Sequence, residues 1–169
     1  MIDPDPSPGQ LRARITKAFG HLRHDDAERL YDAELADDYG QETALTRRLH
    51  DLTYEQWSQI PDWAIAQAPS ALSFLSPEAY RFHLPAYMVW TLENYDTSNS
   101  LSADMTIYSL LVADHYDDVR ALKLARFELF DHAQRNAVVT FLRFAASHGE
   151  YLDAQAAQRA LDSYWAASR

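Results

Sequence analysis

The chain has 169 residues, which is the length of a single domain with a sizeable core. Its formal net charge is −10, from 25 acidic and 15 basic residues, and it contains no cysteine. This charge argues against direct binding to nucleic-acid phosphates or to an anionic membrane, and it leaves a basic protein partner open. The lack of cysteine excludes disulfides, thiol nucleophiles and cysteine-bound metals.

The composition favours helix over strand. Leucine occurs 20 times, whereas valine and isoleucine together occur 10 times. Branching at Cβ favours strands, so this balance favours helices. No glycine lies between Gly40 and Gly149, although a series of tight β-hairpins would use several there. We therefore predict an all-α domain, a compact helical bundle.

The first residues, 1–7, are rich in proline and aspartate and lack the apolar run of a secretory signal. We expect a disordered lead-in over 1–7 and one helical domain over 8–169. No segment has the apolar length that a membrane span needs, and the missing cysteines fit a reducing compartment. A cytoplasmic location is therefore expected.

Several helix starts can be located from capping signals. Ser7 followed by Pro8 predicts a first helix that runs to about Gly20. Apolar residues at helical spacing predict two more helices, near 27–35 and 45–52. The stretch 53–56 has the form of a capping box, and the prolines at 61 and 69 divide the segment after it into short helical pieces.

The central segment after Ser76-Pro77-Glu78 is apolar on nearly every side from Ala79 to Tyr95. A helix of that kind belongs in the middle of a fold. Pro85 lies inside it and should kink or split it.

A polar loop is expected over 96–104, and residues 105–112 fit either a helix or a minor strand. A capping box at Asp131 predicts the next helix, with Gly149 just past its end. A last helix is expected from about Asp153.

Two stretches resemble a known family. One is Phe74-Leu75-Ser76-Pro77-Glu78-Ala79-Tyr80-Arg81-Phe82-His83-Leu84-Pro85-Ala86-Tyr87-Met88. The other combines Gln134, Val138-Val139, Phe141-Leu142, Ala160-Leu161 and Tyr164-Trp165. Together they are similar to the pattern of a family of small bacterial proteins of unknown function, although His83 stands where that family has an aromatic residue. The resemblance implies a bacterial origin and one compact domain, and it implies no activity.

The few glycines exclude the usual phosphate-binding loops, dinucleotide-binding turns and nucleophile elbows. Histidines near acidic residues occur at His21 and His24, at His115 and at His132, but none has the spacing of a zinc or di-iron motif. We therefore predict no metal site and no cofactor.

Glu78, Arg81 and His83 are polar residues on the otherwise apolar central segment. In one interpretation Glu78 and Arg81, one helical turn apart, form a structural ion pair. In the other, the three are an acid, an anion clamp and a proton shuttle in the pocket of a hydrolytic enzyme. The position of these side chains, in an open pocket or in a buried and satisfied cluster, decides between the two interpretations.

The acidic residues are concentrated in two stretches. Residues 25–42 hold eight acids and one base, and residues 82–119 hold six acids and neither lysine nor arginine. We predict a non-enzymatic interaction protein, such as an immunity or inhibitor protein, that binds a basic partner. The expected contact residues are Asp25, Asp26, Asp32, Asp37, Asp38, Asp114, Asp117 and Asp118.

Overall fold

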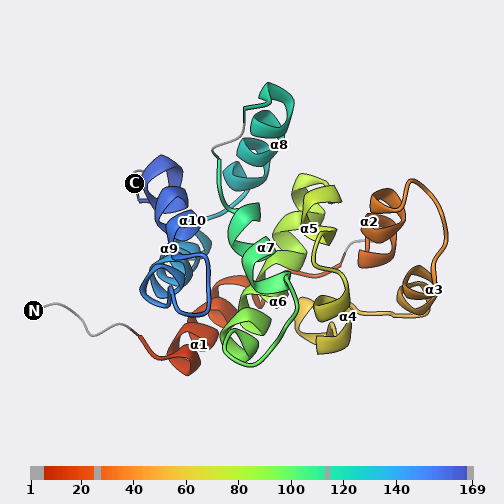
Figure 1. The fold of residues 1–169 in the computed structure, drawn as a ribbon, viewed down its shortest axis with the longest axis horizontal. Coiled ribbons are helices and arrows are strands. Elements are labelled where there is room, and N and C mark those ends of the chain that lie inside the picture. Colours follow the sequence, from red (N-terminus) through yellow and green to blue (C-terminus); the bar gives the residue numbers. More distant parts are fainter. Residues whose placement is uncertain (1–5, 25–27, 113–114, 167–169) are drawn as a thin grey trace, which may run out of the picture.

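The computed structural model describes residues 6–24, 28–112 and 115–166, and within these ranges it contains helices and no strand. The all-α prediction is confirmed (Figure 1). The α-helices are α1 (Pro8–Phe19), α2 (Leu30–Asp37), α3 (Ala44–His50), α4 (Asp62–Gln67), α5 (Ala71–Phe74), α6 (Pro77–Asn94), α7 (Ser102–Ser109), α8 (Asp117–Glu128), α9 (His132–Ser147) and α10 (Ala154–Ala160). A 3₁₀ turn, η1 (Trp57–Gln59), precedes α4, and a π-helical turn, η2 (Leu161–Trp165), continues α10.

The central helix α6 organises the fold. Pro77 occupies its first turn, and the Ser76 hydroxyl accepts a hydrogen bond from the Ala79 backbone N–H. Most of its side chains are buried, and it packs against α1, α4, α5, α7, α8 and η1. Figure 1 shows it near the centre of the molecule. Pro85 lacks the N–H that would bond to the Arg81 carbonyl, yet α6 is not split there and continues to Asn94.

The buried Arg126 joins α8 to this centre. Its guanidinium donates hydrogen bonds to the carbonyls of Ser73 and Leu75, at the end of α5, and lies over the Tyr80 ring at 4.8 Å. The last carbonyls of a helix have no partner within it, so the arginine satisfies groups that burial would otherwise leave unpaired. The first half of α8, in contrast, is exposed on all sides.

The capping signals at Ser7, Ser76 and Asp131 predict helix starts correctly. Ser7 and Asp131 form capping boxes at α1 and α9, and Asp153 caps α10. The prediction of a capping box over 53–56 is wrong, because no helix begins there and Gln56 instead precedes η1. The Gln59 side chain accepts hydrogen bonds from the backbone N–H groups of Glu55 and Gln56.

The segment 105–112, left open between helix and strand, forms most of α7, so the strand alternative is wrong. Because α7 begins at Ser102, the preceding loop is shorter than expected. The sequence analysis predicts no helix over Asp117–Glu128, where the structure has α8. Residues 1–5 of the expected lead-in lie outside the described residues.

No helix in the described ranges has both the length and the apolar character needed to cross a membrane.

Candidate functional site

The three polar residues of the central helix do not meet in one place. Glu78 is exposed in the first turn of α6, Arg81 is half-buried, and His83 is completely buried. No ion pair forms between Glu78 and Arg81, both of which lie in the described part of the chain. The spacing rule for helix neighbours predicted that pair wrongly, because a stronger set of partners reaches Arg81 from another helix.

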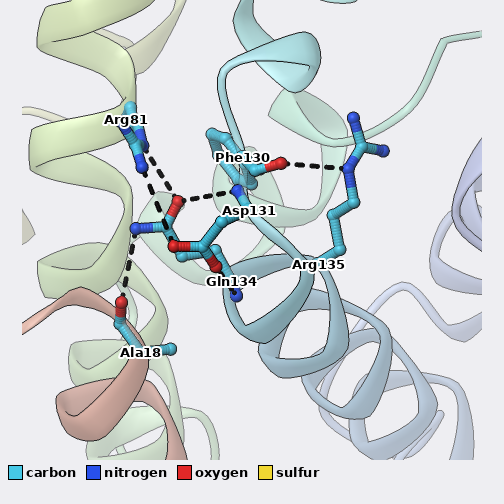
Figure 2. A network of polar contacts seen from close by, with 6 residues as sticks. All are labelled: Ala18, Arg81, Phe130, Asp131, Gln134 and Arg135. Atoms are coloured by element: carbon cyan, nitrogen blue, oxygen red, sulfur yellow. Dashed lines mark hydrogen bonds and ion pairs between the residues drawn. The ribbon is translucent and has the colours of Figure 1, made fainter.

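Arg81 belongs to a network at the N-terminus of α9 (Figure 2). Its Nε donates to Gln134 Oε1 at 2.9 Å, and the same oxygen accepts from the Asp131 backbone N–H at 3.2 Å. Gln134 Nε2 donates to the Ala18 carbonyl of α1. An Arg81 guanidinium nitrogen also lies 4.0 Å from Asp131 Oδ2. Arg81 and Gln134 thus tie α6, α9 and α1 together, which is a structural role.

His83 is hydrogen-bonded at both ring nitrogens. Nδ1 lies 2.7 Å from the Ala79 carbonyl, which can only accept, so Nδ1 carries the proton. Nε2 therefore accepts from the Tyr54 hydroxyl at 2.8 Å, and the Tyr54 oxygen in turn accepts from the Leu30 N–H. Burial lowers the pKa of His83 to about 4, so the imidazole is neutral near pH 7. A buried, neutral and satisfied histidine fits a structural role better than that of a proton shuttle.

Glu78 and Arg81 do line a small cavity of about 180 Å³ at the surface. Arg23, His24 and Glu28 from the segment after α1 also line it, whereas His83 does not. The Glu28 carboxylate accepts from the Ser76 N–H at the start of α6, so part of this polar set stabilises a helix terminus. Two members of the predicted trio therefore share a cavity, and the third lies outside it.

The predicted acidic contact residues fall into two groups on different helices. Asp25, Asp26 and Asp114 lie outside the described residues. Asp32 is exposed and accepts from the Arg29 N–H at the start of α2, while Asp37 and Asp38 are half-buried at its end. Asp117 and Asp118 are exposed in the first turn of α8, which Figure 1 shows well apart from α2.

The end of α2 carries a feature that the sequence analysis missed. Residues 37–42, here called the acidic turn, contain Asp37, Asp38, Tyr39, Gly40 and Glu42. Tyr39 is 96% exposed and has a backbone φ of 55°, in the left-handed region, followed by Gly40 at 79°. That region costs a bulky residue on the order of 1 kcal/mol, and here it accompanies an almost fully exposed tyrosine side chain. A glycine after two aspartates at a helix end is the only local signal of this turn.

Glu34 lies on the buried side of the same helix. Its exposure is 6%, and its Oε1 atom is buried without a hydrogen-bond partner. Burial, together with the nearby charges of Asp37 and Asp38, raises the pKa of Glu34 to about 7. The carboxyl group therefore changes its protonation near neutral pH, beneath the acidic turn.

Within the described ranges, no three histidine, aspartate or glutamate side chains come close enough together to hold a metal ion. The absence of a metal or cofactor stays a prediction.

Comparison with known families identifies the chain: it belongs to DUF6714, a family of unknown function, whose model matches residues 9–169. This agrees with the resemblance to a family of unknown function, and the match extends over α1 to α5 as well. Comparison of the chain with curated proteins and with solved structures found no match.

The Arg81 network predicts unequal effects for two substitutions on α6. Arg81→Ala should lower the free energy of unfolding by about 1–2 kcal/mol, because Gln134 Oε1 loses a charged donor next to the start of α9. Glu78→Gln, on an exposed side chain, should change it by less than about 0.5 kcal/mol. Chemical denaturation measures both. Equal losses of unfolding free energy in the two variants would instead support an ion pair between Glu78 and Arg81 and would contradict the network.

Glu34 predicts a pH dependence of stability. Its pKa in the folded protein is about 7, against 4.5 for the ordinary side chain, so the folded state holds this proton more tightly. The associated stability is complete below about pH 4.5 and is lost as the pH rises through 7. Glu34→Gln should therefore stabilise the protein at pH 8, on the order of 2 kcal/mol, and change it little at pH 5. Thermal unfolding of the wild type and the variant at both pH values tests this. Equal stability of the two proteins at pH 8 as well as at pH 5 would contradict it.

Proposed function

We propose that this chain is a non-enzymatic bacterial interaction protein that captures a basic protein partner through its acidic turn. An immunity or inhibitor protein, directed against a basic toxin or nuclease in the cytoplasm, is the concrete form of this proposal. The absence of cysteine fits that reducing compartment.

The observation that carries the proposal is the exposure of Tyr39 among carboxylates. From Leu30 to Glu42 the chain has five acids and no base, and Tyr39 stands out from the end of α2. A tyrosine ring supplies contact area at low entropic cost, and it attracts a cationic side chain over its face. Asp37 and Asp38 on the preceding positions complement the charge of an arginine or lysine bound there.

The acidic residues of α8 support the proposal less. Over Asp117–Glu128 three acids are balanced by three bases, Arg120, Lys123 and Arg126. Asp117 and Asp118 also occupy the first helical turn, where negative charge stabilises the helix itself. The acidic field that would attract a basic partner is therefore centred on α2.

The alternative, a hydrolytic enzyme with Glu78, Arg81 and His83 in one pocket, has weaker support. His83 is buried and satisfied by Tyr54 and Ala79, and Arg81 is engaged with Gln134. A general acid or base has to reach its substrate. The burial of His83 therefore favours the interaction protein.

Binding kinetics of the partner recovered by affinity capture test the proposal. Association of the wild type should slow roughly tenfold or more between low and physiological salt, because the attraction acts between exposed charges. Asp37→Asn/Asp38→Asn should slow it at low salt with little change in melting temperature, and Tyr39→Ala should mainly speed dissociation.

Asp117→Asn/Asp118→Asn is the matched control, because it removes the same charge from α8 and should leave the association rate nearly unchanged. If the association rate does not change with salt and is equal in the wild type and in both charge variants, the acidic turn is not part of the binding site.

A further inference from the structure

A groove of about 330 Å³ lies between α1 and α9. Arg14 and Lys17 are exposed along its α1 side, and the buried Ala18 and Ala137 contribute methyl groups to it. Asn136 and Thr140 line it from α9, together with Ala133. The groove thus combines an apolar surface with two cations and contains no carboxylate.

The two helices that form the groove are basic, although the chain as a whole is acidic. α1 and α9 contain Arg12, Arg14, Lys17, Arg135 and Arg143, and neither contains an aspartate or glutamate. The net charge of −10 is therefore carried by other parts of the molecule. A group that suits the groove has an apolar or aromatic part beside negative charge.

The acidic turn has that chemistry. The Tyr39 side chain is almost fully exposed. Its neighbours in the sequence include Asp37, Asp38 and Glu42. A volume of about 330 Å³ exceeds that of one tyrosine side chain. In Figure 1, α2 and α3 lie toward one end of the long axis, and α1 and α9 lie toward the other. The turn of one molecule therefore cannot enter its own groove.

We propose that the groove between α1 and α9 binds the acidic turn of a second copy of this chain. Tyr39 of one copy packs against Ala18 and Ala137 of the next, and Asp37 and Asp38 face Arg14 and Lys17. This inference rests on the proposed function in one respect, that the acidic turn is a docking surface. It adds the surface that receives the turn and the identity of one partner.

The geometry makes the association head-to-tail. Each copy keeps one unused groove and one unused turn after pairing, so a contact of this kind extends into short chains rather than closing as a symmetric dimer. One turn in one groove is a small interface, which places the association in the weak and transient class. Because the contact joins opposite charges at the molecular surface, salt should weaken it.

Sedimentation velocity with two complementary variants tests the proposal. The turn variant carries Asp37→Lys and Asp38→Lys, and the groove variant carries Arg14→Glu and Lys17→Glu. Wild-type protein at low salt should grow in mass from about 10 μM to about 500 μM, as expected for a small interface, and it should return to monomer at high salt.

Each variant alone should remain monomeric, because one of its two surfaces now repels the other. An equimolar mixture should associate again, because the native turn of the groove variant fits the native groove of the turn variant, and the reversed turn and reversed groove also attract each other. Asp96→Lys/Glu150→Lys, with the same change in charge as the turn variant at other exposed positions, should associate like the wild type.

A wild-type protein that stays monomeric at the highest concentration and low salt overturns the proposal. So does association that stops at a dimer, or that persists unchanged in both single variants. If the turn variant loses a recovered basic partner while the wild type is monomeric, the proposed function stands and only the self-association fails. If the chains form but the recovered partner binds without the turn, the proposed function fails and the self-association stands.

Discussion

The rest of the structure depends on one constraint, the burial of α6 on nearly every side. A helix with this many large apolar side chains has to be covered from every direction, and burying one such side chain contributes about 1.5–3 kcal/mol. That cover comes from α1, α4, α5, α7, α8 and η1. Two of the polar groups buried around α6 are satisfied locally: His83 by Tyr54 and Ala79, and the end of α5 by Arg126.

This constraint explains why the three polar residues of α6 do not come together in one place. Once His83 is enclosed, its two nitrogens need partners inside the protein, since an unsatisfied buried group costs about 1–3 kcal/mol. Arg81, nearer the surface, is used to join α6 to the start of α9. The groups left for contact with other molecules are on the peripheral helices, and these differ sharply in charge: α2 is acidic and α1 with α9 is basic.

The sequence predicts what is decided within a few residues and misses what is decided across the fold. The starts of α1, α6 and α9 follow from side chains at Ser7, Ser76 and Asp131 that bond to nearby N–H groups. The Arg81–Gln134 bond spans 53 residues, so the local pairing rule selected Glu78 instead. The sequence does not predict α8, because its N-cap Tyr116 makes no side-chain cap and the first half of the helix is exposed. The exposure of Tyr39 has no signal in its neighbours beyond Gly40.

We propose that the acidic turn, and not the polar start of α6, is the surface that meets a partner. Hydrogen–deuterium exchange of the protein, alone and in complex with the basic partner recovered by affinity capture, locates that surface directly. We expect slower exchange of the backbone amides over 37–42 in the complex and unchanged exchange over 76–83. Protection around Glu78 and Arg81, with the acidic turn exchanging as in the free protein, would contradict the account.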